Sequence, residues 1–369
     1  MNNFILINNQ KVGLELAKER FKTLDVADWR RLVYGFLVEW FDVEKTTVWL
    51  KTSGSTGLPK TFEVKKTMLT ESAKLTGLFF DLKPNDVALM CLSADYVAGK
   101  MMLVRAAVLG LDLICIEPDS TVFKHFSPTR RIDFAAFLPI QLYQILKDKN
   151  HISWINHYFK TIIVGGASID AHQETLALHQ IKASIFATFG MTETVSHIAL
   201  RPLGSESYTL LPHTSMDTDG RSCLKIRSVV TQNEWIATND LVELVSEHEF
   251  IWLGRLDNVV NSGGVKVVVE VLEREILALI ELYYEALMGK RFFIFGLKDD
   301  FWGEKICLVF ELNSTDFEPL ESDFKLILRQ HLVNKYWMPK QFFAIKTFVE
   351  TQTQKIDRQK TIALLLSNN

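Results

Sequence analysis

Strand-like runs alternate with helix-like segments from the N-terminal region to about residue 200, and this alternation limits the folds open to the chain. The runs are short and rich in β-branched or aromatic residues; they are TTVWLKTS, DVALMCL, DLICIEP, DFAAFLP, TIIVGG and ASIFATFG. Strands that alternate with helices form parallel βαβ units, because a parallel pair needs a long crossover connection. The sequence therefore predicts an α/β fold with mixed, mostly parallel sheets covered by helices.

The pattern changes after about residue 200, where short strand-like pieces and turns replace the alternation: SCLKIRSVV, EWIATNDLVELVS and EFIWLGR. A smaller segment from Leu256 contains a helical VEVLEREILALIEL, two strands in FFIFGLKDDFWGEKICLVFEL, a helix near FKLILRQHLVNKY and a polar tail. We therefore expect a large domain over residues 1–255, β-rich from about 200 to 255. A small α+β domain over residues 256–369 should follow it; this boundary rests on the motifs described below, not on composition.

Composition excludes several classes of function. The formal net charge of -3 provides no global positive field for nucleic acid or an anionic membrane. The four cysteines are scattered without paired spacing, which favours reduced core residues over disulfides or zinc. The start of the chain lacks the features of a secretory signal, and charged residues interrupt its most apolar stretch. We expect a cytoplasmic protein with small-molecule partners and no membrane or nucleic-acid partner; the oligomeric state stays open, a homo-oligomer included.

The segment TSGSTGLPK combines glycines, hydroxyls and a lysine after the strand-like TTVWLK. Glycine lets backbone N–H groups approach an anion closely, hydroxyls add donors, and lysine adds charge. The sequence therefore predicts a phosphate-binding loop built from Thr52, Ser53, Gly54, Ser55, Thr56, Gly57 and Lys60. A plain Ser/Gly turn is the structural alternative. The spacing differs from the G-x-x-x-x-G-K-[ST] loop, which disfavours an ATPase of that class.

This whole segment resembles the signature of the adenylate-forming superfamily, which includes acyl- and aryl-CoA synthetases, peptide-synthetase adenylation domains and luciferases. Other motifs of that family follow in the same order. The resemblance implies an enzyme that uses ATP and Mg²⁺ to convert a carboxylic acid into its acyl-AMP. It then passes the acyl group to the thiol of coenzyme A, while the small C-terminal domain rotates between the two half-reactions.

Two motifs of the large domain resemble the family's adenine and phosphate contacts: TIIVGG with the alanine that follows it, and FATFGMTET. By this resemblance Phe189 stacks on the base, Thr192 bonds the α-phosphate and Glu193 holds magnesium, which prefers hard oxygen ligands. The backbone that lies near the nucleotide is implied to come from Gly165, Gly166, Ala167, Gly190 and Met191.

The segment ATNDLV resembles the family's T-G-D, with Asn239 in place of the glycine. Asp240 is implied to accept hydrogen bonds from both ribose hydroxyls. Asparagine tolerates left-handed backbone conformations better than most residues, so we expect the replacement to be mild. In GRLDNVVNSGG, the resemblance assigns Arg255 to ribose and phosphate and Asp257 to the hinge. A turn cap and a surface ion pair are the structural alternatives for Asp240 and Arg255.

Two further assignments concern the C-terminal part. Gly263 and Gly264 end GRLDNVVNSGG and are implied to open the way for the pantetheine arm of coenzyme A, a hairpin turn being the alternative. TQTQKIDRQKT resembles the family's G-K-I-D-R, with Gln354 where glycine is usual. Lys355 would then contact the substrate carboxylate and the α-phosphate as charge develops in the transition state. A solvated surface lysine is the alternative.

The acid is suggested by LSADYVAGKMMLVRAAVLG, which places Lys100 and Arg105 in an apolar, helix-like segment. Buried cations need anionic partners, so an arginine here suggests a substrate with a second carboxylate. A salt bridge to a neighbouring acid, or a snorkelling side chain, is the alternative.

The spacing of Gly99 and Arg105, with a phosphate loop that begins as early as Thr52, resembles compact o-succinylbenzoate-CoA ligases of menaquinone biosynthesis. In that subfamily the arginine is attributed to substrate binding. Two other functions stay open: a CoA ligase for another acyl or aryl acid, in which Arg105 is structural, and a non-catalytic nucleotide-binding relic.

Overall fold

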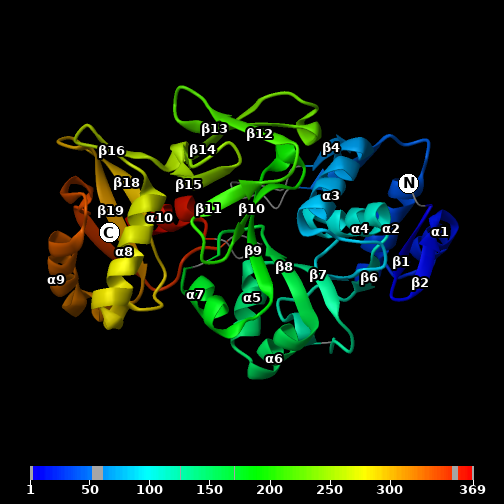
Figure 1. Ribbon diagram of the computed structural model, residues 1–369. Helices are drawn as coiled ribbons and strands as arrows, with labels where there is room; N and C mark the ends of the chain where they lie inside the picture. The colour runs from blue at the N-terminus through cyan, green and yellow to red at the C-terminus, as the bar shows by residue number, and fades with distance from the viewer. Residues whose placement is uncertain (1–2, 52–60, 125, 170, 351–355, 368–369) are drawn as a thin grey trace. The chain divides into compact units, whose positions relative to one another are not determined.

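The computed structural model describes residues 3–51, 61–124, 126–169, 171–350 and 356–367 (Figure 1). The chain forms two compact units. The first comprises Met1–Asp217, Lys225–Ile236 and Leu244–Phe250, and the second comprises Thr218–Leu224, Ala237–Glu243 and Ile251–Asn369. The second unit therefore includes two short segments that precede its main part. The predicted boundary between a domain of residues 1–255 and one of residues 256–369 stays a prediction.

Parallel strands form the centre of the first unit, in the order β6-β5-β7-β8-β9. These strands are β5 (Val87–Met90), β6 (Asp112–Cys115), β7 (Ile132–Phe137), β8 (Phe159–Val164) and β9 (Ser184–Gly190). Their helices are α3 (Lys66–Phe80), α4 (Val97–Leu109), α5 (Pro139–Leu146), α6 (Lys149–Tyr158) and α7 (Ala171–Gln180). Figure 1 shows α3 and α4 on one side of these strands and α5 to α7 on the other. This arrangement confirms the predicted α/β class.

Antiparallel and parallel strands extend the sheet at both ends. At one end, β10 (His197–Pro202) and β11 (Ser207–Leu210) continue from β9 in antiparallel pairing, which confirms the change expected near residue 200. At the other end, β1 (Phe4–Ile7) pairs parallel with β6, and β2 (Gln10–Gly13) pairs antiparallel with β1. Two helices follow, α1 (Leu14–Thr23) and α2 (Trp29–Phe41).

One predicted strand has a different partner from the one expected. The segment TTVWLKTS contains β3 (Thr47–Lys51), which pairs antiparallel with β4 (Thr61–Lys65) in a separate two-stranded sheet. Its assignment to the parallel sheet was wrong. Lys51 and Thr61 are partners, and the residues between them are too few for a parallel crossover, which needs a dozen or more.

The β-rich part predicted before Leu256 is present. Its strands are β12 (Thr214–Thr218), β13 (Cys223–Ser228), β14 (Ile236–Leu244) and β15 (Glu249–Arg255). They coincide with the three strand-like pieces found in the sequence, and β12 adds a strand before them.

The second unit contains its own sheet of β16 (Val260–Ser262), β17 (Val265–Val267), β18 (Phe292–Asp299), β19 (Gly303–Glu311) and β20 (Gln341–Ile345). Its helices are α8 (Val269–Tyr283), α9 (Ser314–His331) and α10 (Arg358–Ser367). The prediction of a polar tail was wrong, because β20 pairs parallel with β19 and α10 packs its buried Leu365 into an apolar cluster. Helix α9 also begins ten residues before FKLILRQHLVNKY, because Phe317 and Leu320 continue its apolar face towards the N-terminus.

All four cysteines are free and buried, as the sequence predicted. Within the described ranges, no helix is both long enough and apolar enough to cross a bilayer.

Candidate active site

The glycines after β8 lie at the carboxyl edge of the parallel sheet, beside the end of β9. A Cβ atom on Gly165 would clash with Oγ1 of Thr188, and Gly166 has a φ of +85°. Both positions therefore require glycine, which leaves bare backbone at this edge. Ligands of open α/β sheets bind outside the carboxyl ends of the strands. This position suits the adenine contact predicted for Gly165, Gly166 and Ala167, which stays a prediction.

The segment after β9 folds back tightly into β10. A Cβ atom on Gly190 would clash with the backbone of Ser196, so the two strands approach closely here. Thr194 is fully buried, and its Oγ1 lies 3.0 Å from the N of Met191 and 2.8 Å from the O of Ser196. This hydroxyl therefore fixes both ends of the turn. The sequence reasoning gave Thr194 no role, because a buried structural hydroxyl has no signal of its own.

Two predicted phosphate and metal residues lie on this turn with their side chains exposed. Thr192 and Glu193 belong to the short helix η2 (Thr192–Thr194). The next residue, Val195, is buried with a φ of +64°, a conformation that is unfavourable for a β-branched residue. Among the described residues, no hydrogen bond or ion pair engages Glu193, so its carboxylate can accept a magnesium ion.

The predicted base-stacking residue, Phe189, is half-buried in an aromatic cluster. Its ring lies 5.7 Å from that of Tyr208 and 5.3 Å from that of Phe250, both edge-to-face. Phe250 is fully buried, so the cluster fixes the Phe189 ring on the sheet. The stacking role of Phe189 stays a prediction.

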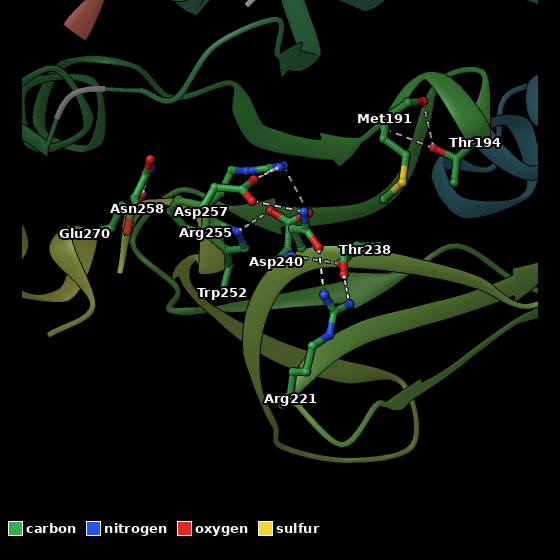
Figure 2. A network of polar contacts seen from close by, with 11 residues as sticks. Met191, Thr194, Arg221, Thr238, Asp240, Trp252, Arg255, Asp257, Asn258 and Glu270 are labelled. Carbon is green, nitrogen blue, oxygen red and sulfur yellow. Dashed lines mark hydrogen bonds and ion pairs between the residues drawn. The ribbon is translucent and has the colours of Figure 1, made fainter. Parts of the chain in front are cut away.

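In the second unit, Asp240 is the centre of a polar network (Figure 2). One carboxylate oxygen accepts a hydrogen bond of 2.9 Å from the indole N–H of Trp252, and the other lies 3.7 Å from a guanidinium nitrogen of Arg255. Its backbone N–H also donates to Oγ1 of Thr238. Asp240 is therefore oriented from both sides, and its second oxygen keeps capacity for a ligand. Trp252 was missed, because an indole two positions before G-R gives no sign of a partner on β14.

Arg255 and the predicted hinge residue Asp257 form an ion pair of 2.6 Å. Burial opposes the charge of Arg255, but the hydrogen bond to Asp257 and the field of Asp240 outweigh it and raise the pKa of Arg255. The same bond lowers the pKa of Asp257. Asp257 also accepts a hydrogen bond from Asn239, whose amide oxygen accepts one from Arg221.

Gly263 and Gly264 form the turn of the β16–β17 hairpin. Their φ angles are +60° and +81°, which a two-residue turn of this kind requires. A Cβ atom on Gly263 would lie 2.9 Å from the ring of Trp302, whereas Gly264 faces open space. The hairpin turn weighed as an alternative is thus present, and the role toward coenzyme A stays a prediction.

A cationic cavity of about 380 Å³ lies in the second unit beside α9. Its apolar lining comes from Leu328, Leu332, Met338 and Pro339, and its cations are Lys325, Arg329, Lys335 and Lys340. The ammonium of Lys340 also lies 4.7 Å from the centre of the Trp302 ring, which links the cavity to the Gly263 hairpin. No acidic residue lines this cavity within the described part of the chain.

Arg105 is buried in the first unit, with only 2% of its surface exposed. Its Nη2 donates to Ser196 Oγ at 2.9 Å and approaches His197 Nδ1 at 3.4 Å, and its Nε donates to Thr76 Oγ1 at 3.4 Å. These acceptors are neutral. Among the described residues, no aspartate or glutamate forms an ion pair with Arg105.

Burial changes the protonation of this cluster. Loss of water lowers the pKa of Arg105 to about 9, so the guanidinium stays charged at neutral pH. Burial and then the charge of Arg105 hold the pKa of His197 well below its ordinary value. Neutral His197 accepts from Arg105 at Nδ1, and its Nε2 then donates to Thr76 at 3.1 Å.

The two other residues singled out in α4 have structural contacts. A Cβ atom on Gly99 would clash with the backbone carbonyl of Ser93, so this glycine allows α4 to approach the preceding loop. Lys100 donates to the backbone O of Trp49 at 2.6 Å and lies over the Phe36 ring. Lys100 thus joins α4 to β3.

Nine predicted positions lie outside the described residues: Thr52, Ser53, Gly54, Ser55, Thr56, Gly57, Lys60, Gln354 and Lys355. Their roles stay predictions. In the part of the chain that is described, no group of three or more His, Cys, Asp or Glu side chains could hold a metal ion.

The comparisons with known proteins agree with one another. The family described as AMP-binding enzyme matches residues 11–222. A 2-succinylbenzoate–CoA ligase from Listeria monocytogenes is 24% identical over 347 residues, which cover 88% of this chain and 71% of that protein. An acyl-CoA synthetase (AMP-forming)/AMP-acid ligase II-like protein from Dyadobacter fermentans is 34% identical, with a TM-score of 0.62 over 96% of this chain and 99% of that chain. An O-succinylbenzoate coenzyme A synthetase from Bacillus subtilis, in complex with ATP and magnesium ion, is 18% identical, with a TM-score of 0.68 over 85% of this chain and 69% of that chain.

Proposed function

Because the chain belongs to the AMP-binding enzyme family and is an AMP-forming acyl-CoA synthetase, we propose that it ligates o-succinylbenzoate to coenzyme A through an acyl-AMP intermediate. One observation carries the choice of acid. Arg105 is a buried, charged guanidinium that meets only neutral acceptors in the described residues.

A buried charge without a counter-ion is unfavourable, because burial removes its hydration. A substrate that brings a second carboxylate would supply the missing charge and accept a bidentate pair of hydrogen bonds. The aromatic carboxylate of o-succinylbenzoate is such a group, and its succinyl carboxylate remains free for activation. The guanidinium of Arg105 also lies 6.0 Å from the centre of the Phe134 ring, which is fully buried in the core.

In the first half-reaction the acid's carboxylate attacks the α-phosphate of ATP, and pyrophosphate leaves. Thr192 would donate to the α-phosphate, and Glu193 would hold the magnesium ion that neutralises charge on the phosphates. Asp240, oriented by Trp252, would accept the ribose hydroxyls. In the second half-reaction the thiol attacks the acyl carbon, and AMP leaves.

The cationic cavity beside α9 supports the thiol half of the proposal. Coenzyme A carries phosphates at its nucleotide end, and lysine and arginine side chains bind phosphate. The cavity is large enough for part of a nucleotide. Its Lys340 lies over the ring of Trp302, which in turn lies close to Gly263. We propose that the nucleotide end of coenzyme A binds there while its pantetheine arm passes the Gly263–Gly264 turn.

The test is ATP–pyrophosphate exchange with o-succinylbenzoate, benzoate and hexanoate as separate acids. We expect o-succinylbenzoate to be the best acid, and Arg105→Met to reduce its exchange by on the order of 100-fold, because truncating one partner of a buried charge pair has effects of that size. Arg130→Met is the matched control, since Arg130 has an acidic partner, Asp112, outside this cluster.

Three results would contradict parts of this proposal. Equal exchange with all three acids would reject o-succinylbenzoate as the substrate. Retention of the preference for o-succinylbenzoate in Arg105→Met would leave that acid as the substrate but make Arg105 structural, a role that its hydrogen bonds to Ser196 and Thr76 could support. Absence of exchange with every acid would favour the nucleotide-binding relic.

A further inference from the structure

Asn239 occupies the position where the family has a glycine, and its backbone does not explain the replacement. It lies inside β14, and its φ is not positive, unlike that of Gln232 or Asn233 nearby. The expectation that asparagine is tolerated for its left-handed conformation was therefore wrong. The position needs no special backbone freedom, so any effect of the replacement arises from the side chain.

The Asn239 side chain connects two charged residues of the second unit. Its Nδ2 donates to Asp257 Oδ1 at 3.1 Å, and its Oδ1 accepts from Arg221 Nη1 at 3.2 Å. A guanidinium can only donate, so it must face the amide oxygen of Asn239. Arg221 is itself held by Asp219 at 2.8 Å, and it donates to the backbone O of Thr238. This chain of contacts directs the Asn239 N–H toward Asp257.

Asp257 is consequently held at both carboxylate oxygens. Arg255 donates to Oδ2 at 2.6 Å while Asn239 donates to Oδ1. Asp257 lies in the short helix η4 (Leu256–Asn258), the segment to which the family resemblance assigns the hinge. A change of backbone angles at Asp257 would move its carboxylate away from at least one of these donors. Glycine at position 239 could not make the second contact.

We propose that Arg221 and Asn239 form a latch on Asp257, which stabilises one conformation of the hinge and so sets the balance between the two half-reactions. The latch rests on the proposed function, because the two half-reactions and the hinge role of Asp257 both come from the same family resemblance. In this proposal Asn239 positions Asp257 and contacts neither substrate nor nucleotide. Its contribution is modest, because the Asp257 side chain is 54% exposed and solvent weakens the contact.

The experiment compares Asn239→Gly with the unmodified protein in two measurements. The first is the distribution of distances between fluorophores on introduced cysteines, Val26→Cys in the first unit and Val333→Cys in the second. These positions are 83% and 89% exposed, and the native cysteines are buried. The second is the ratio of the adenylation rate to the rate of thioester formation from preformed o-succinylbenzoyl-AMP.

We expect Asn239→Gly to shift the distance distribution and to change the rate ratio by about threefold to tenfold, the effect of losing one net hydrogen bond. Arg221→Ala should change both quantities in the same direction but by a smaller amount, since the Asn239 amide could still donate to Asp257. Asn313→Gly is the matched control. Its amide also donates to an aspartate, Asp316 at 2.9 Å, but at the start of α9.

The latch proposal would be overturned if Asn239→Gly and Asn313→Gly gave the same distribution of fluorophore distances and the same ratio of adenylation to thioester formation. If Asn239→Gly does not fold, Arg221→Ala carries the same test. Absence of adenylation in the unmodified protein would reject the proposed function instead, and the distance distribution would still report on the latch.

Discussion

At the scale of single residues, Arg105 was predictable from the sequence, whereas its hydrogen-bond partners are known only from the structure. An arginine among apolar residues in a helix-like segment was sufficient to predict a buried cation. Its partners were not predictable, because Thr76, Ser196 and His197 are 29, 91 and 92 positions away in the chain. Contacts at such separations depend on the order of the strands, which one sequence does not specify.

His197 should make stability depend on pH. Its pKa in the folded protein is held below the value of about 6.5 that an unfolded histidine has. Below pH 6.5, His197 therefore binds a proton in the unfolded chain but not in the folded protein, so the free energy of unfolding falls as pH decreases. The slope from this one group approaches about 1.4 kcal/mol per pH unit.

The measurement is Tm between pH 7 and pH 5 for the unmodified protein and His197→Asn, whose amide oxygen can still accept from Arg105. We expect the variant to lose less stability over this interval. Other titrating groups are common to both proteins and cancel in the comparison. Identical slopes would show that His197 titrates in the folded protein much as it does in the unfolded chain.

At the scale of elements, the position of α4 depends on the absence of a side chain at Gly99. Gly99 lies where a Cβ atom would clash with the backbone carbonyl of Ser93, and Arg105 follows on the same helix. Gly99→Ala should therefore displace α4 and destabilise the first unit by about 1–3 kcal/mol, the range for overpacked sites. It should also weaken the preference for o-succinylbenzoate.

The matched control is Gly220→Ala, because Gly220 has nothing within 4 Å of an added Cβ atom. Chemical denaturation should show a change within about 0.5 kcal/mol for this control. If both alanine variants unfold at the same denaturant concentration as the unmodified protein, the packing of α4 on Ser93 is looser than the structure indicates.

The elements that the sequence predicted well are those whose pattern is strong over their whole length. The runs of β5, β7 and β8 are almost continuously apolar, as in strands buried on both faces, and α8 has clear helical periodicity. The misassigned ones had weak or ambiguous signals. Strand β20 is only five residues long beside charged neighbours, and β3 has a strand pattern that suits antiparallel and parallel pairing equally.

At the scale of the whole molecule, the residues that the sequence motifs single out are divided between the two units. Thr192, Glu193 and Arg105 belong to the first unit, whereas Asp240 and Arg255 belong to the second. The order of motifs along the chain predicted which residues to consider. It could not predict that the short segment around Asp240 belongs with the C-terminal residues, because that grouping depends on non-local contacts such as the bond from Trp252.

Each unit also has its own apolar core, so the molecule should not unfold in a single step. One cluster, which includes Phe134, lies wholly in the first unit, and another, which includes Phe310, lies wholly in the second. Both phenylalanines are fully buried, and truncating such a side chain to alanine destabilises its core by about 3–5 kcal/mol. Calorimetry should therefore show two transitions, with Phe134→Ala lowering one Tm and Phe310→Ala lowering the other. A single transition that both variants lower equally would mean that the two units unfold cooperatively.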